Sequence, residues 1–284
     1  MSDLDRLIVL GETLLQRLDA VLPATVQPSD WSAHAWRWRK QGGQGFMRAV
    51  AHPRHIRLAD LQGIDRQKTM LQRNTLQFVR GLPANNVLLT GSRGTGKSSL
   101  IKALLAEYAD EGLRLLEVDK ADLTDLPDIA DLLATRPERF ILFCDDLSFE
   151  AGDPGYKALK VALDGSIAGA ADNLLIYATS NRRHLMPEFM TENLESDEIR
   201  PGDTVEEKIS LSERFGLWLS FYAFDQDEYL AIVKHWLAHF GIARLTPQAR
   251  RAALQWALGR GSRSGRVAWQ FARDWVGQQA LSKK

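Results

Sequence analysis

The chain has 284 residues, an apolar fraction of 45% and a formal net charge of zero, which is ordinary for a globular protein and too apolar for a disordered one. It contains no run of about 18 apolar residues of the kind that spans a membrane, and its single cysteine, Cys144, excludes an internal disulfide. Because Asp3 and Asp5 stand where a secretory signal would be positively charged, we expect a cytoplasmic location.

The zero net charge hides an uneven distribution along the chain. Residues 1–57 carry 8 basic and 5 acidic residues, residues 58–225 carry 18 and 28, and residues 226–284 carry 10 and 3, which gives charges of +3, −10 and +7. We predict three units with these boundaries: an N-terminal helical and basic segment, an α/β core, and a helical C-terminal unit. A basic unit beside an acidic one fits parts that meet around a polyphosphate or a neighbouring copy, and nucleic-acid binding is the other possibility.

The first predicted element is an amphipathic helix over residues 4–22, whose leucines recur at three- and four-residue steps. Residues 31–57 then contain no acidic residue, while their basic side chains alternate with Trp31, Trp36 and Trp38. Basic and aromatic side chains together can hold a single nucleic-acid strand. We favour the simpler interpretation, in which the tryptophans pack against the core and the arginines stay in solvent.

A helix over residues 66–80 follows, and Gly81 ends it before the first strand of the core. Leu61 and Ile64 form an apolar hook just upstream of this helix. The hook is well placed to contact a purine ring, although simple packing residues would show the same pattern.

Residues 91–98 match the pattern G-x-x-x-x-G-K-S between an apolar strand at 86–90 and a helix that begins near Ser98. Their glycines let successive N–H groups point at phosphate oxygens, and the helix N-terminus adds its positive dipole end. Lys97 would contact the β and γ phosphates, and Ser98 would hold Mg²⁺. The residues expected around a nucleotide's phosphates are Gly91, Ser92, Arg93, Gly94, Thr95, Gly96, Lys97, Ser98 and Ser99. This stretch predicts nucleotide binding.

A strand at 113–118 and an Asp-rich helix at 123–133 precede an apolar run that begins at Arg139 and ends in Asp145 and Asp146. A run this continuous predicts a buried parallel strand. Such a strand would bring Asp145 to Mg²⁺ beside the phosphate loop, and Asp146 could orient or deprotonate the attacking water. An N-cap pair for the next segment is the alternative interpretation.

A short helix at 155–163 and a strand at 174–179 follow, and Asn181 comes just after this strand. If the strand is adjacent to the one that carries Asp145, Asn181 can reach the γ-phosphate and the attacking water, because ligands bind at the carboxyl ends of parallel strands. An asparagine after a strand is otherwise a common turn former.

The remainder of the chain predicts one more strand and a helical bundle. Residues 190–207 are polar and acidic, as in a surface excursion. A last strand is expected at 217–222. The three predicted helices of the bundle span residues 226–240, 246–258 and 264–279.

The ordered set of the phosphate loop, the paired carboxylates, Asn181 and the segments 212–215 and 265–268 resembles the AAA+ ATPases over residues 58–284. It looks closest to a bacterial group of predicted AAA+ ATPases catalogued as domain of unknown function 815, and no established cellular role comes with that match. The resemblance implies a P-loop α/β fold with a five-stranded parallel sheet between helices, a C-terminal helical lid and an added N-terminal helical segment.

The resemblance also implies roles for single residues. Lys97 and Ser98 match the Walker A contacts to phosphate and metal, and Asp145 matches the Walker B metal ligand. Asp146 stands where many members have a catalytic glutamate, and aspartate is shorter by one methylene. Asn181 matches the polar sensor on the fourth strand of such cores.

Two arginines and the apolar hook complete the implied site. Arg214 matches the finger that a neighbouring subunit inserts, and Arg266 matches the second sensor on the lid, with Arg263 as its competitor. Surface pairing of Arg214 with a nearby glutamate, or capping of a helix end by Arg266, would be the alternatives. Leu61 and Ile64 match the adenine-contacting segment.

We therefore expect an ATPase that uses ATP and Mg²⁺ at a site shared between protomers of a homo-oligomer, and that switches or loads a macromolecular partner. The connection at 119–125 contains no aromatic residue, unlike the pore loop of protein-threading relatives, which disfavours an unfoldase. The alternative is a slowly hydrolysing, ATP-dependent adaptor or clamp that binds protein or nucleic acid. A P-loop kinase is a third possibility, weakened by the helical bundle and by Arg214.

Overall fold

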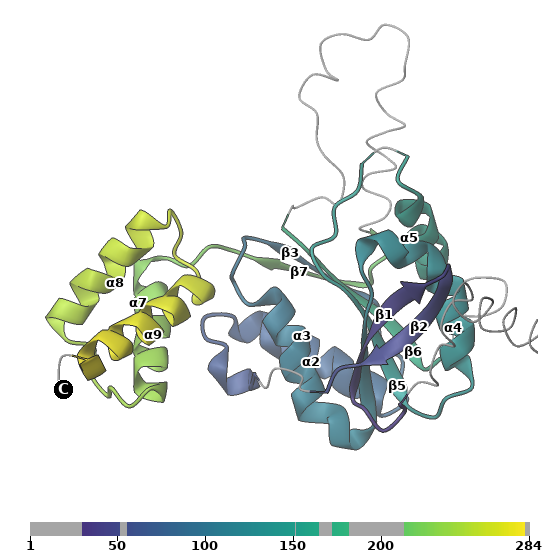
Figure 1. The fold of residues 1–284 in the computed structure, drawn as a ribbon, viewed down its shortest axis with the longest axis horizontal. Coiled ribbons are helices and arrows are strands. Elements are labelled where there is room, and N and C mark those ends of the chain that lie inside the picture. Colours follow the sequence, from purple (N-terminus) through teal and green to yellow (C-terminus); the bar gives the residue numbers. More distant parts are fainter. Residues whose placement is uncertain (1–29, 52–55, 151, 165–171, 182–212, 282–284) are drawn as a thin grey trace, which may run out of the picture.

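The computed structural model describes residues 30–51, 56–150, 152–164, 172–181 and 213–281. A twisted sheet with helices on both faces makes up the larger part, and a bundle of three helices lies beyond one edge of it (Figure 1). Within the described ranges no helix is long and apolar enough to cross a membrane. The predicted helix at 4–22 and the predicted excursion at 190–207 lie outside the described residues.

The described part of the sheet contains seven strands in the order β2-β1-β4-β5-β6-β3-β7. Every neighbouring pair is parallel except β1 with β2. The strands are β1 (Ala35–Gln41), β2 (Gln44–Ala49), β3 (Val87–Gly91), β4 (Leu113–Glu117), β5 (Arg139–Cys144), β6 (Leu174–Ser180) and β7 (Leu217–Phe221). The strand before the phosphate loop, β3, therefore lies between β6 and β7, and its carboxyl end faces the same edge as theirs.

The fold class predicted from the sequence is confirmed, since all five predicted core strands are present, adjacent and parallel. The sheet is nevertheless two strands wider than predicted, because β1 and β2 form a hairpin whose first strand pairs in parallel with β4. The alternation of apolar and basic side chains along β1 explains why it forms a strand of this sheet. Trp36 and Trp38 are buried against one face of the sheet, while Arg37 between them is exposed. The predicted packing of these tryptophans on the core is confirmed.

The basic side chains of the hairpin stay partly exposed to solvent, as predicted, and they also pair with acidic side chains of the core. Arg37 pairs with Glu117 at 3.1 Å, and Arg39 pairs with Asp119 at 2.6 Å. Lys40 lies 2.9 Å from the Asp125 carboxylate, which also accepts a hydrogen bond from Trp38 Nε1. Part of the negative charge of the central segment is thus balanced by the hairpin, which weakens the case for nucleic-acid binding by these residues.

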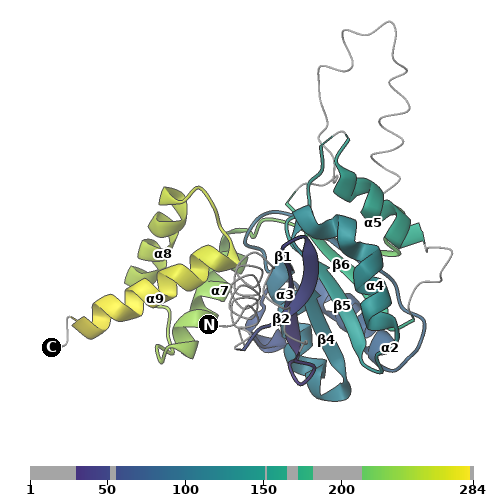
Figure 2. The same ribbon diagram turned by 45° about the vertical axis from the view of Figure 1, so that its right-hand side comes forward.

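Helices cover the two faces of the sheet in pairs. The helices of the larger part are α2 (Asp65–Val79), α3 (Lys97–Tyr108), α4 (Leu126–Ala134) and α5 (Pro154–Asp164), with short 3-10 turns at Leu58–Asp60, Ala109–Glu111 and Lys120–Asp125. Buried residues of α2 and α3 share one hydrophobic cluster, while those of α4 and α5 share the other cluster with Trp36 and Trp38. Figure 2 shows α4 and α5 together in front of the sheet.

The three C-terminal helices are α7 (Gln226–His239), α8 (Pro247–Gly259) and α9 (Gly265–Leu281). A capping box starts α7, since Asp225 accepts a hydrogen bond from the Glu228 N–H and the Glu228 carboxylate accepts one from the Asp225 N–H. The buried side chains of the bundle belong to the same cluster as those of α2, α3 and β3. This continuous core seats the bundle against the carboxyl end of β3, where the phosphate loop begins.

Candidate nucleotide-binding site

The phosphate loop joins β3 to α3 with glycine at the positions that need it. Gly91, Gly94 and Gly96 all have positive φ angles, of 120°, 75° and 103°. A Cβ atom on Gly91 would lie 1.9 Å from the carbonyl oxygen of Phe221 on β7. The loop therefore forms only because this residue has no side chain.

Lys97 is the first residue of α3, and it is 5% exposed. Its Nζ donates hydrogen bonds to the carbonyl oxygens of Gly91 and Ser92, at 2.7 and 2.8 Å, and to Asn181 Oδ1 at 3.1 Å. Burial lowers the pKa of Lys97 from its ordinary value, and the charges of Asp145 and Asp146 oppose that shift. The ammonium group is thus held over the concave side of the loop, where a phosphate would lie.

Ser98 and Asp145 meet although they lie 47 positions apart. Ser98 Oγ donates a 2.6 Å hydrogen bond to Asp145 Oδ1, which also accepts one from Thr179 Oγ1 at 2.6 Å. A hydroxyl beside a single carboxylate suits Mg²⁺, which takes its remaining oxygen ligands from phosphates and water. The described residues contain no group of three or more His, Cys, Asp or Glu that could hold a metal by itself.

Asp146 follows β5 in an unusual backbone conformation. Its φ of 54° is the only positive φ at a non-glycine residue in the described ranges. Its N–H donates to Thr179 Oγ1 at 2.9 Å, and its Oδ1 accepts a hydrogen bond from Asn181 Nδ2. The predicted adjacency of the strands that carry Asp145 and Asn181 is confirmed, since β5 pairs with β6.

A single cavity of about 920 Å³ joins these groups to the C-terminal bundle. The residues that line it from the loop after β7 and from the bundle are Phe224, Ile232, Trp236, His239, Gly265, Arg266, Trp269 and Gln270. The bundle also contacts the loop directly, because the Arg266 N–H donates to the carbonyl oxygen of Gly94 at 3.4 Å. A Cβ atom on Gly94 would lie 2.8 Å from Ser264 Oγ, so the glycine permits this approach.

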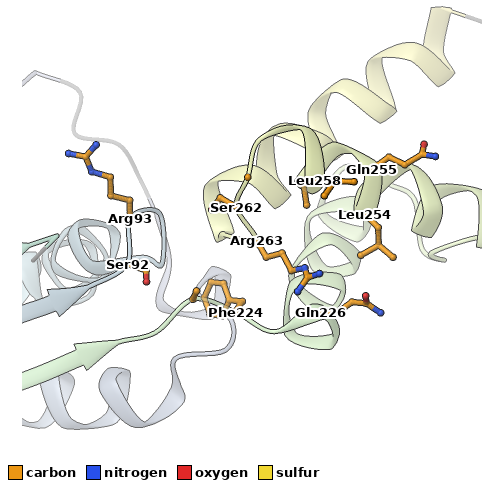
Figure 3. Close-up of a pocket in the computed structure, with 12 residues that line it drawn as sticks. Ser92, Arg93, Phe224, Gln226, Leu254, Gln255, Leu258, Ser262 and Arg263 are labelled. Atoms are coloured by element: carbon orange, nitrogen blue, oxygen red, sulfur yellow. The ribbon is translucent and has the colours of Figure 1, made fainter. Parts of the chain in front are cut away.

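The two arginines that competed for the lid role lie in different places. Arg266 lines the cavity described above, while Arg263 lines a second cavity of about 770 Å³ between the phosphate loop and the bundle. Figure 3 shows that second cavity, with Ser92 and Arg93 on one wall and Arg263 among the residues of the bundle opposite. The position of Arg266 therefore agrees with the preference for it.

The predicted apolar hook closes the opposite side of the nucleotide cavity. Leu61 and Ile64 both line it, and both are at least nine-tenths buried. Each lies within 4 Å of the position that a Cβ on Gly96 would occupy. They are at once core packing residues and part of the cavity wall. Their contact with a purine ring stays a prediction.

Arg214 is the one predicted site residue that the structure keeps apart from the others. It forms an ion pair with Asp164 at the end of α5 and does not line the nucleotide cavity. The sequence had not suggested Asp164 as a partner. Cys144, in contrast, is fully buried as expected, and burial raises the pKa of its thiol.

Several residues of the cavity were missed from the sequence. Thr179 bridges Asp145 and Asp146, and Trp236 and Trp269 face the cavity from the bundle. A signal existed for the bundle, because Ile232, Trp236 and His239 recur at helical spacing, as do Arg266, Trp269 and Gln270. Helical spacing from Arg266 along its own helix points to Trp269 and Gln270, whereas the residues of α7 needed the packing of the bundle.

The strand order, the phosphate loop after β3 and the carboxylates after β5 define an AAA+ P-loop fold with a helical lid. Over 80% of its length the chain matches the structure of a RuvB mutant from Thermotoga maritima, covering 67% of that chain at 18% identity with a TM-score of 0.50. A structure titled as the RuvB Holliday junction branch migration motor of the same organism matches 76% of this chain and 71% of its own at 16% identity, with a TM-score of 0.39.

The particular family follows from the sequence match. Residues 31–279 match the family described as "Protein of unknown function (DUF815)", and the chain belongs to that family. No match is found among curated proteins.

Proposed function

We propose that this protein is an ATPase that hydrolyses ATP to ADP and phosphate with Mg²⁺, at a site between its α/β core and its helical lid. The observation that carries the proposal is the convergence of Lys97, the Ser98–Asp145 pair, the Asp146–Asn181 pair and Arg266 on one cavity. These residues come from four separate parts of the chain. A packing role alone gives no reason for them to meet at the mouth of a phosphate-binding loop.

Each side chain has a role that its position supports. The loop N–H groups and Lys97 would bind the β and γ phosphates. Ser98 and Asp145 would hold Mg²⁺, which neutralises charge on the phosphates when it is bound. Leu61, Ile64 and the indoles of the lid would enclose the base.

The hydrolytic step requires a water molecule aligned with the terminal phosphate. Asp146 would accept a proton from this water while its oxygen bonds to the γ-phosphorus and the bond to the β–γ bridging oxygen breaks. Asn181 lies within hydrogen-bond reach of both Lys97 and Asp146, so it would position the base and the water together. Arg266 would add positive charge from the lid.

We further propose that the site is completed by a second protomer. Arg214 lies outside its own nucleotide cavity, held by Asp164 at the end of α5. An arginine in that position can act on the site of a neighbouring copy, and a homo-oligomer that forms with ATP would bring it there. ATP-driven assembly would then switch or load a macromolecular partner.

Particle mass measured with and without ATP, together with phosphate release, tests this proposal. We expect a larger assembly with ATP and turnover that rises with protein concentration, because each site needs a neighbour. Turnover that is independent of protein concentration would contradict the proposal of a site shared between protomers. Tight ATP binding with negligible phosphate release would instead favour the alternative, an ATP-dependent adaptor or clamp on a protein or nucleic acid.

A further inference from the structure

Arg93, the third residue of the phosphate loop, lies on the wall between two cavities. It lines the nucleotide cavity and also the second cavity beneath the lid. Its side chain is 77% exposed, so the guanidinium group can move between partners without disturbing the core. The roles assigned above use its backbone as part of the phosphate loop and give its guanidinium group no separate task.

The present partner of Arg93 is the proposed base. Arg93 Nη2 lies 3.5 Å from Asp146 Oδ2, while Asp146 Oδ1 accepts the hydrogen bond from Asn181. The Asp146 carboxylate is therefore held from two sides, and the Asp146 backbone N–H is fixed by its hydrogen bond to Thr179. Arg93 pairs with the carboxylate oxygen of Asp146 to which Asn181 does not donate.

The second cavity offers Arg93 no other anion. No Asp or Glu is among its described lining residues, and Arg263 stands on its opposite wall. Figure 3 shows the side chains of Arg93 and Arg263 directed away from one another. Asp146, the carboxylate that pairs with Arg93, lines the nucleotide cavity, where ATP would place its phosphates.

A nucleotide would change the balance between these partners. An ion pair between two exposed side chains contributes little, because water and salt screen it. A guanidinium group can donate two parallel hydrogen bonds to a phosphate, an arrangement roughly twice as strong as a neutral hydrogen bond. The guanidinium group of Arg93 would therefore leave Asp146 and bind the terminal phosphate of ATP. ADP lacks that phosphate, so the ion pair would stay in place.

We propose that Arg93 is a positioning residue that distinguishes ATP from ADP: it holds Asp146 when the γ-phosphate is absent and releases it when the γ-phosphate binds. This inference rests on the proposed ATPase function, whose base is Asp146. It makes the base available only when there is a phosphate to attack.

Nucleotide affinities of Arg93 variants test this inference. The dissociation constants of Mg·ATPγS and Mg·ADP would be measured by calorimetry for the parent protein, Arg93→Ala, Arg93→Lys and Arg263→Ala. We expect Arg93→Ala to weaken ATPγS binding about tenfold more than ADP binding, because one charge-assisted contact is lost. Arg93→Lys should keep part of the discrimination, and Arg263→Ala should leave the ratio unchanged, since Arg263 lines only the second cavity.

A double-mutant cycle tests the exchange itself. If Asp146 competes with the γ-phosphate for Arg93, Asp146→Asn should tighten ATPγS binding more in the parent than in Arg93→Ala, by about two- to fivefold. An equal effect in both backgrounds, or an unchanged ratio of the two affinities in Arg93→Ala, would overturn the inference while leaving the ATPase proposal intact. Failure of the parent to bind either nucleotide would overturn both.

Discussion

Ser98 Oγ lies 2.6 Å from Asp145 Oδ1, so the first turn of α3 and the end of β5 share a hydrogen bond across the carboxyl edge of the sheet. The strand β6 lies between β3 and β5, and its Thr179 donates a second hydrogen bond to the same carboxylate oxygen. This contact pre-positions two oxygen ligands for a cation, and the predictions below concern the groups arranged around it.

Replacement of Lys97 by alanine should abolish productive nucleotide binding. The variant loses a buried ammonium group that would contact two phosphates, and we expect ATP affinity to fall about 10- to 100-fold. Calorimetric titration with Mg·ATP measures this directly. Lys102→Ala, further along the same helix, is the matched control, and ATP binding by Lys97→Ala as tight as that of the parent would contradict the assignment of the loop.

Replacement of Asp146 by asparagine should separate binding from turnover. Asparagine tolerates the left-handed backbone found at this residue, so the fold should persist while the proton acceptor is lost. We expect ATP to bind and phosphate release to fall about 10²- to 10⁴-fold. Unchanged turnover would transfer the role of base to another carboxylate, with Glu150 the first to test.

Arg214 is expected to act in a neighbouring protomer. Arg214→Ala should leave ATP binding intact and lower turnover about 10³-fold or more, while stability changes by less than about 1 kcal/mol because its pair with Asp164 is partly exposed. Mixing Arg214→Ala with Lys97→Ala should restore part of the activity, since a mixed interface can join an intact Lys97 to an intact Arg214. Two inactive variants that stay inactive when mixed would argue against a shared site.

Alkaline pH should destabilise the protein through Tyr177. Burial raises its pKa from 10.0 to about 12, although its hydroxyl bonds to Asn74 and Thr75. A raised pKa contributes stability that is complete below pH 10 and is lost as the pH rises to about 12, by on the order of 2–3 kcal/mol.

Tyr177→Phe tests this origin of the alkaline sensitivity. The urea midpoint of the variant should fall less between pH 10 and 12 than that of the parent. Burial also raises the pKa of Tyr229 to about 12, so Tyr229 should account for some of the decline that remains. Tyr222→Phe, at an exposed position, is the control. An identical pH dependence in Tyr177→Phe and the parent would contradict the assignment.

The lid indoles should report nucleotide binding. Trp236 and Trp269 line the nucleotide cavity and are partly exposed, so a bound base would change their surroundings. We expect an ATP-dependent change in tryptophan emission that shrinks in Trp236→Phe and in Trp269→Phe. Trp31→Phe, which lies against Trp36 in the hydrophobic cluster of the other sheet face, should keep the full change.

The amino-acid sequence determined the local parts of this site. Three glycines and Lys97 at fixed spacing specify the phosphate loop, because only glycine takes the backbone angles that the loop needs. The continuous apolar run of β5 likewise indicated a strand buried on both faces, with its carboxylates at the end. Such features depend on neighbours along the chain and can be predicted from it.

Other features were decided by tertiary structure, because they depend on residues far apart in sequence. The hairpin of β1 and β2 joins the sheet through pairing with β4, and the acidic partners of its basic side chains lie about 80 positions away. In the same way, the contact of Arg93 with Asp146 exists only because strand order places the end of β5 near the loop after β3. Local spacing specified the phosphate loop, but packing of the sheet and lid decided which side chains meet around it.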